Sequence, residues 1–302
     1  MPEPALIRLE EAVDLAHAWL QQAAHARGIR VLFIKGPALH RQGLRSYRVS
    51  GDVDVLVEPA RFDEFCTHLV DVGWEERETV LLGELTTLHS RTYLRQGWPC
   101  DIDVHSHYPG FLGDASRVFE ALWVRRTPLD FAHQTCLVPD RVAGVLILAL
   151  HSLRGTAAQE RHDNELHELL AIELTASERT QLAELAVATG STETLQPVLH
   201  DLGVEVPASA EDPSPDVREW RARVDAGSLG AYQWFVAYRR SRGIGKVRIL
   251  WRAFWPSDHD LLLSHPELPD AFWPKLRGRV ARWGRGLRSL PRAVRAIWHN
   301  RG

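Results

Sequence analysis

Two short segments that alternate acidic and apolar residues restrict the fold of this chain most. The first, VSGDVDVLV (residues 49–57), is typical of a buried strand yet carries Asp52 and Asp54 at its start. The second, CDIDVHSHYPG (100–110), repeats the arrangement with Asp101, Asp103, His105 and His107. Residues two apart in a strand point to the same face, so each segment predicts a strand with one polar face. The opposite face is expected to pack against helices, and in the first strand it holds Val53, Val55 and Val57.

Carboxylates paired in this way need either water or a cation. Desolvating a carboxylate is costly, and two this close cannot both stay ionised without a compensating positive charge. A divalent ion that prefers oxygen ligands, Mg²⁺ or Mn²⁺, would supply that charge. The simpler alternative is that Asp52 and Asp54 occupy a solvent-exposed strand end beside a helix N-terminus. The residues themselves leave open whether Asp101 or Asp103 would be the third carboxylate of a metal site.

The rest of the pattern predicts an α+β fold, with a small mixed sheet flanked by helices and a helical region after it. In the first 110 residues the periodicity predicts helices at 5–28 and 59–74, helical turns at 37–46, and strands at 31–36, 52–57, 86–95 and 99–106. After about residue 110 the pattern becomes helical, with helices predicted at 139–153 and 160–174 and a third begun by a Thr175–Glu178 capping box. We expect three regions, at residues 1–130, 131–208 and 209–302. The last is rich in Trp and Arg and mainly helical.

Charge and cysteine content exclude some classes of protein. The formal net charge of the 302 residues is −3, which argues against a protein that coats nucleic acid through bulk positive charge. The three cysteines lie far apart without a CxxC pair, which indicates a reducing compartment and no cysteine zinc cluster. The first twenty residues carry acids through their apolar part, unlike a signal peptide, and the longest apolar run is about half of what spans a bilayer. We therefore expect a soluble, cytoplasmic protein.

Residues that suit phosphate binding precede the first acidic strand. Lys35 and Gly36 end the predicted strand VLFIKG at a tight turn, where a triphosphate could approach backbone N–H groups. Arg45 and Arg48 lie just before the acids, where guanidinium groups could hold phosphate oxygens.

The order of these motifs resembles the polymerase-β-type nucleotidyltransferase superfamily. A strand leads to Lys35-Gly36, about fifteen residues follow, and then come Arg48, Ser50, Asp52-Val53-Asp54-Val55 and Asp103-Val104-His105. More narrowly, the chain is similar to the bacterial "uncharacterised nucleotidyltransferase" family, whose motifs run K-G, R-x-x-x-D-I-D-L-L-V and D-L-H. The resemblance covers roughly residues 25–175, because His151 matches a helical histidine of that family and Asp163 matches an aspartate.

The resemblance implies roles for individual residues. Asp52 and Asp54 would be metal ligands, and Asp103 would be the third carboxylate, which in the superfamily helps to deprotonate the acceptor hydroxyl. Lys35, Gly36, Arg48 and Ser50 would border the nucleotide phosphates. The family register favours Asp103 over Asp101, and His105 follows the family pattern, whereas His107 does not. Two positions depart from it: Pro37 has no N–H to offer a phosphate, and Gly51 stands where the narrower family often has Ser.

The function that the sequence favours is Mg²⁺-dependent transfer of a nucleoside monophosphate from an NTP to an acceptor, with release of pyrophosphate. The acceptor is not identified by any motif. Pro37 and Gly51 motivate an alternative, a catalytically degenerate binding module on the same fold. A third hypothesis is a metal-dependent phosphoesterase built from Asp101, Asp103, His105 and His107.

The C-terminal segment is basic. Residues 271–302 contain nine Lys or Arg residues and no Asp or Glu, and apolar residues interleave with the arginines. This composition suits peripheral contact with an anionic membrane, with RNA or with a protein partner. The alternative is a charged helix face that covers a local core.

Overall fold

The computed structural model describes residues 7–79, 89–153, 159–207, 212–226, 230–265 and 267–299. These residues form two compact units, a larger one made mainly of residues before 214 and a smaller one made mainly of those that follow. The two units are described separately.

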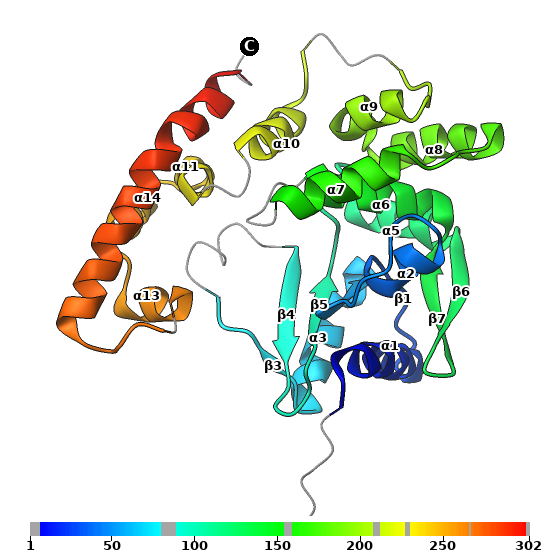
Figure 1. Ribbon diagram of the computed structural model, residues 1–302, viewed down its shortest axis with the longest axis horizontal. Helices are drawn as coiled ribbons and strands as arrows, with labels where there is room; N and C mark the ends of the chain where they lie inside the picture. Colours follow the sequence, from blue (N-terminus) through cyan, green and yellow to red (C-terminus); the bar gives the residue numbers. More distant parts are fainter. Residues whose placement is uncertain are drawn as a thin grey trace, which may run out of the picture. The chain divides into compact units, whose positions relative to one another are not determined.

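A five-stranded mixed sheet lies at the centre of the larger unit (Figure 1). Its strand order is β1-β2-β5-β4-β3, and the strands are β1 (Val31–Phe33), β2 (Asp52–Val57), β3 (Glu75–Glu76), β4 (Ser90–Leu94) and β5 (Asp101–His105). Strands β2 and β5 pair in parallel, whereas the other neighbours are antiparallel. Short helical segments connect the first strands, namely α2 (Gly36–Arg41), η1 (Pro59–Arg61) and α3 (Phe62–Asp71), and α1 (Leu9–Ala26) precedes them. The predicted α+β fold with a small mixed sheet is confirmed.

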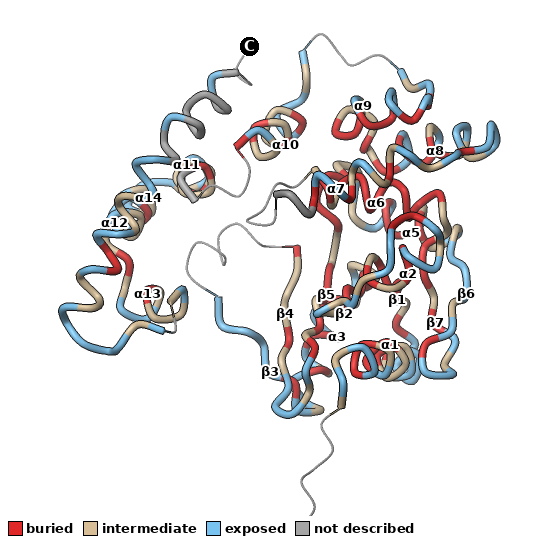
Figure 2. The backbone as a smooth tube through the Cα atoms, in the orientation of Figure 1, coloured by how far each residue is buried: buried red, intermediate tan, exposed pale blue. Residues whose placement is uncertain are grey.

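The apolar face of β2 packs as its alternation predicts. Val53, Val55 and Val57 are fully buried, in one hydrophobic core with Ala16 of α1 and Phe65 of α3. Figure 2 shows this burial along the strands and the facing side of α1. Because side chains alternate along a strand, Asp52 and Asp54 lie on the opposite face of the sheet.

A β-hairpin occupies residues for which the sequence predicts a helical region. Helix α5 (Ala115–Trp123) is followed by β6 (Arg126–Phe131) and β7 (Gln134–Pro139), which pair antiparallel. Ala132 and His133 form the two-residue turn, and both have positive φ angles, 45° and 63°. Such turns usually contain Asn or Gly, so an Ala-His turn gives no hairpin signal. The hairpin runs across the boundary expected at residue 130.

Four helices complete the larger unit: α6 (Arg141–Leu153), α7 (Gln159–Leu170), α8 (Ala176–Thr189) and α9 (Thr192–Asp201). Helix α6 is almost entirely buried and packs against α7, α8 and α9. The predicted capping box at the start of α8 is confirmed, since Thr175 accepts from the Glu178 N–H and the Glu178 side chain accepts from the Thr175 N–H.

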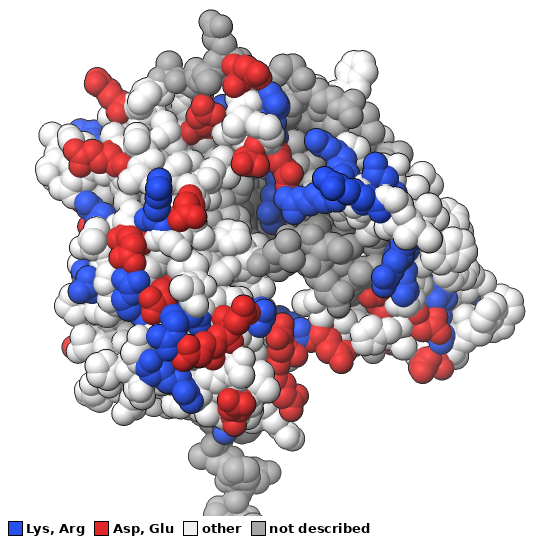
Figure 3. Space-filling model, turned by 180° about the vertical axis from the view of Figure 1, so that it is seen from behind, with Lys and Arg blue, Asp and Glu red and all other residues white. Residues whose placement is uncertain are grey.

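The smaller unit is helical in the part of the chain that the structure describes. It contains α10 (Pro215–Ala226), α11 (Gly230–Arg240), α12 (Ile244–Phe254), α13 (Asp258–Ser264) and α14 (Phe272–His299). On the face drawn in Figure 3, Lys and Arg side chains gather over part of this unit, whereas basic and acidic side chains are mixed over the larger one. Among the described helices of both units, none has the length and apolar content needed to cross a membrane.

Candidate functional site

The parallel pairing of β2 and β5 brings the two acidic segments together. In the strand register Asp54 lies opposite Asp103, and Asp52 lies opposite Asp101. Adjacent strands are about 4.8 Å apart, so a carboxylate on one strand lies directly beside its counterpart on the other. One ligand atom each from Asp54, Asp103 and His105 lie within 4.8 Å of one another.

Asp54 is the most enclosed of these carboxylates. Its side chain is buried, and its Oδ1 lies 2.5 Å from Lys35 Nζ and 2.9 Å from His105 Nε2, which donates to it. Burial alone would raise the pKa of Asp54, but the Lys35 charge and the His105 hydrogen bond outweigh it, and the pKa lies below its usual range. Asp54 is therefore ionised at neutral pH.

Asp52 and Asp103 have the opposite tendency. Burial, together with the negative charge of Asp54, raises the pKa of Asp52 to about 6. The same two causes, in the same order, raise the pKa of Asp103, even though Thr92 Oγ1 donates to Asp103 Oδ1 at 2.6 Å. Burial and the neighbouring Asp54 charge thus disfavour the ionised forms of Asp52 and Asp103.

The Lys35–Gly36 turn lies beside these acids and has an unusual backbone. Lys35 has φ 63° and ψ −148°, a region that L-residues adopt only when the surrounding structure enforces it. Gly36 follows with φ 52°, and an added Cβ there would lie 3.7 Å from Ser50 Oγ. The turn therefore lies close to Ser50, whose Oγ donates to Asp52 at the start of the acidic strand at 3.2 Å.

Two arginines connect this turn to helix α7. Arg45 is buried and donates to the Gly36 carbonyl oxygen at 2.6 Å and to Glu165 Oε1 at 3.3 Å. Arg48 forms an ion pair with the same carboxylate oxygen. Glu165 is itself buried. Arg48, the arginine predicted to border the phosphates, thus forms an ion pair with a carboxylate on α7.

The remaining residues singled out in the sequence are placed differently. Asp101 forms an ion pair with Arg77. Neither Asp101 nor Asp52 is part of the described group Asp54–Asp103–His105 that could share an ion. His107 lies beyond the end of β5, so it does not share the strand face as predicted, and it contacts Ser106 and His89. Asp163 lies on the exposed face of α7. His151, near the end of α6, lies 3.5 Å from Glu165.

Sequence reasoning missed three residues of this region: Thr92, His162 and Glu165. Thr92 lies opposite Asp103 in the antiparallel register of β4 and β5. His162 and Glu165 are three apart on α7, a spacing that places both on one helix face. The spacing of His162 and Glu165 was the only signal that they form a pair. Asp163 and His167, four apart on the other face of α7, have an equally helical spacing, so spacing does not tell which pair lies inside.

The donor set fits a divalent cation. Carboxylates are the ligands that Mg²⁺ and Mn²⁺ prefer, and three of them share this end of the sheet. Two have pKa values raised first by burial and then by the charge of Asp54, and a bound cation would favour their charged forms.

Comparison with known proteins agrees with this arrangement. A family described as "Uncharacterised nucleotidyltransferase" matches residues 14–200, more than half of the chain. The chain belongs to this nucleotidyltransferase family. The resemblance drawn from the Lys-Gly, Asp-x-Asp and Asp-x-His motifs is thereby confirmed at the level of the family.

Solved structures of low sequence identity are also similar to the chain. One is an antigenic nucleotidyltransferase-like protein from Paracoccidioides brasiliensis, with 15% identity, a TM-score of 0.41, and coverage of 66% of this chain and 95% of that one. Another is a lincomycin-bound lincosamide antibiotic adenylyltransferase, LnuA, with 12% identity, a TM-score of 0.33, and coverage of 58% and 96%. No curated protein matches the sequence.

Proposed function

We propose that this chain is a divalent-metal-dependent nucleotidyltransferase that transfers a nucleoside monophosphate from an NTP to an acceptor hydroxyl or phosphate and releases pyrophosphate. The observation that carries the proposal is the register of β2 and β5, which sets Asp54 beside Asp103 with Asp52 on the same sheet face. Membership of a nucleotidyltransferase family supports it.

Asp52, Asp54 and Asp103 would hold the metal. Bound Mg²⁺ or Mn²⁺ would neutralise the triphosphate and stabilise the charge that develops during phosphoryl transfer. The directions of the pKa shifts divide their roles, since the pKa of Asp54 is lowered whereas those of Asp52 and Asp103 are raised. Asp54, ionised and fixed by Lys35 and His105, is suited to hold a cation at any pH near neutrality.

Asp103 is suited to move a proton. Its raised pKa makes its carboxylate a stronger base, and Thr92 fixes one of its oxygens. We infer that its other oxygen, Oδ2, takes the proton of an acceptor hydroxyl. The hydroxyl oxygen of the acceptor then attacks the α-phosphorus. The bond from the α-phosphorus to the bridging oxygen breaks, and pyrophosphate leaves.

The Lys35–Gly36 turn and Arg48 would position the triphosphate. Lys35 already lies at the carboxylates, and Arg48 is oriented by Glu165. Pro37 lies in the first turn of α2 and offers no N–H, so phosphate binding at this turn would depend on side-chain cations. A degenerate binding module on the same fold could hold the phosphates in the same way. The enzyme differs from it in needing a correctly placed Asp103.

The test compares carboxylates that face each other across the strand pair. Purified protein is incubated with α-labelled NTPs, Mg²⁺ and a cell lysate, and transfer of label is measured together with pyrophosphate. We expect Asp54→Asn and Asp103→Asn each to lower the rate by at least about a hundredfold. Asp101→Asn, on the same strand but paired with Arg77, is the matched control and should keep most activity.

Two results would contradict the proposal. Full transfer by a folded Asp54→Asn protein would exclude the assigned site. Tight Mg²⁺-dependent NTP binding without label transfer to any lysate component would favour the binding module. The phosphoesterase hypothesis predicts instead that His107→Ala abolishes hydrolysis, and the position of His107 beyond the strand end does not support it.

A further inference from the structure

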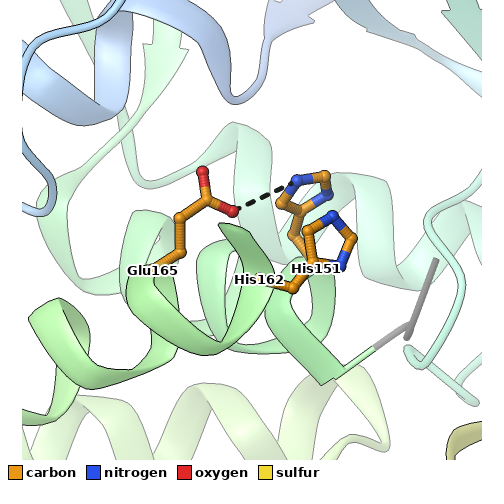
Figure 4. Close-up of side chains that lie close together, drawn as sticks. All are labelled: His151, His162 and Glu165. Atoms are coloured by element: carbon orange, nitrogen blue, oxygen red, sulfur yellow. Dashed lines mark ion pairs between the residues drawn. The ribbon is translucent and has the colours of Figure 1, made fainter. Parts of the chain in front are cut away.

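A second group of metal-capable side chains lies between helices α6 and α7, separate from the three aspartates. It consists of His151, His162 and Glu165, drawn in Figure 4. One ligand atom from each lies within 4.8 Å of the other two. His162 and Glu165 are both about 4% exposed, so their polar atoms lie in the interior of the unit.

We propose that His151, His162 and Glu165 bind one transition-metal ion of the Zn²⁺ type. Two imidazoles and one carboxylate are a ligand set that suits Zn²⁺ and its neighbours, whereas Mg²⁺ prefers oxygen ligands alone. This binding goes beyond the nucleotidyl transfer proposed above, which uses carboxylates on the sheet.

The spacing of the donors supports a shared ion. Ligand bonds of the length usual for Zn²⁺, at a tetrahedral angle, place neighbouring donor atoms about 3.4 Å apart. His151 Nε2 and Glu165 Oε2 are 3.5 Å apart, close to this value and longer than a normal hydrogen bond. The two imidazole rings lie 4.8 Å apart between centroids and are tilted by 48°, so they are not stacked on each other.

The two oxygens of Glu165 have different surroundings. Oε1 pairs with the guanidinium groups of Arg45 and Arg48, whereas Oε2 is buried and accepts no hydrogen bond. A buried carboxylate oxygen without a donor is unfavourable, and a cation shared with the two imidazoles would satisfy it. The arginines would then act as the outer hydrogen bonds that commonly orient a ligating carboxylate.

A metal-free explanation of the same geometry exists and predicts different behaviour. A protonated His151 could pair with Glu165, and the positive charge of two arginines nearby would oppose a cation. In that case the cluster would have no selectivity for Zn²⁺. Metal binding to the whole chain therefore decides between the two explanations.

The experiment measures metal directly. The full-length protein is stripped with a chelator, dialysed, and titrated with Zn²⁺, and bound metal per chain is measured by elemental analysis. Co²⁺ serves as a spectroscopic probe, since its visible absorption reports tetrahedral coordination by nitrogen and oxygen. We expect one Zn²⁺ per chain to remain when Asp54 and Asp103 are both changed to Asn, and this binding to be weakened at least about tenfold by His162→Ala or His151→Ala.

Controls separate this cluster from the sheet carboxylates and from loss of folding. His167→Ala removes a histidine from the exposed face of the same helix and should bind Zn²⁺ as the unchanged protein does. The double variant Asp54→Asn/Asp103→Asn removes the other described cluster and should also keep the Zn²⁺ site. Circular dichroism of each variant would test whether it is folded.

Three outcomes would overturn the proposal. They are no Zn²⁺ bound by the stripped and refilled protein, unchanged Zn²⁺ binding and Co²⁺ spectrum in a folded His162→Ala protein, or loss of the ion in the Asp54→Asn/Asp103→Asn variant. The nucleotidyl transfer assay is a separate readout, so failure of one proposal leaves the other standing.

Discussion

The guanidinium group of Arg45 connects the carbonyl oxygen of Gly36 to the carboxylate of Glu165. Its contacts are 2.6 Å to Gly36 and 3.3 Å to Glu165, and the arginine is buried. A turn with an unfavourable Lys35 conformation is therefore held by a residue outside it. Through this contact, a helix far along the chain stabilises the position of the lysine that pairs with Asp54.

The first prediction concerns this link. Arg45→Lys keeps the charge but cannot reach both acceptors with a fixed planar group. We expect a loss of about 2 to 4 kcal/mol in the free energy of unfolding, measured by urea denaturation, because a buried acceptor or carboxylate loses its partner. Arg61→Lys is the control, since the Arg61–Glu64 pair is exposed and contributes little. Equal, small losses in both variants would show that Arg45 does not stabilise the turn.

A second prediction concerns the hydrogen bond from Thr92 to Asp103. A donor to a carboxylate favours its charged form, so this bond lowers the pKa of Asp103 against the larger effect of burial. Thr92→Val removes the donor and should raise that pKa further. If Asp103 accepts the proton of the acceptor, the acidic limb of the pH–rate profile should shift to higher pH.

The control for this shift is Thr67→Val on α3, where the hydroxyl donates to the Asp63 carbonyl oxygen. It should leave the profile as it is in the unchanged protein. A Thr92→Val profile that moves to lower pH, or does not move, would contradict the assignment of Asp103 as the base.

The strands that form the site could be predicted from the sequence because their alternation is strict. Strand β2 begins and ends at the expected residues, since Asp-Val-Asp-Val leaves one choice of buried face. The family resemblance implied that Asp103 joins Asp52 and Asp54, but the register that sets Asp103 opposite Asp54 comes from the structure. Thr92 could not be predicted in the same way, because its position depends on the register between β4 and β5. The sequence indicates a turn at Gln96-Gly97, where Gly97 has a positive φ angle, but a turn signal alone does not say which residues lie opposite each other.

Helix α7 shows a second limit. Its sequence, QERHDNELHELL, carries polar residues around most of its circumference, so periodicity does not identify the face that turns inward. Asp163 was favoured by the family resemblance, yet Glu165 is the acid that lies buried against Arg45 and Arg48. A buried carboxylate is stable there only because two arginines from another segment reach it, and a sequence does not display that proximity.

A third prediction concerns the smaller unit and contact with anionic membrane surfaces. Along α12, the five residues Ile244, Val247, Leu250, Trp251 and Phe254 are each more than half exposed. At helical spacing they share one face, and the buried Ile249 lies on the other. Lys246 and Arg248 flank the apolar face on its two sides, the arrangement of a helix that lies in an anionic membrane surface.

The measurement for this prediction is co-sedimentation with vesicles. We expect the protein to co-sediment with vesicles that contain phosphatidylserine. The variant in which Val247 and Trp251 are both changed to Glu should no longer bind them. The matched control, Val187→Glu/Val124→Glu, alters two exposed apolar residues of the larger unit and should not affect binding. Equal binding to neutral vesicles, or binding only to RNA or to a second protein, would contradict a membrane role for this face.

The last prediction concerns His17, a fully buried histidine of α1. Its ring stacks on Phe131 at 4.2 Å between centroids, and Nδ1 donates to the Val13 carbonyl oxygen at 2.7 Å. Burial lowers the pKa of His17 to about 4 in the folded protein, from 6.5. The unfolded chain therefore binds a proton below pH 6.5 that the folded chain does not bind until about pH 4. The free energy of unfolding must fall as the pH decreases through this window, and the loss between pH 7 and pH 5 is about 2 kcal/mol.

His17→Phe retains the aromatic stack and cannot be protonated, so the free energy of unfolding from urea denaturation should show a pH dependence smaller by that amount. His25→Gln, on the exposed side of the same helix, is the control for simple loss of a histidine. If the two variants lose stability equally between pH 7 and pH 5, the buried ring of His17 is not the group that titrates.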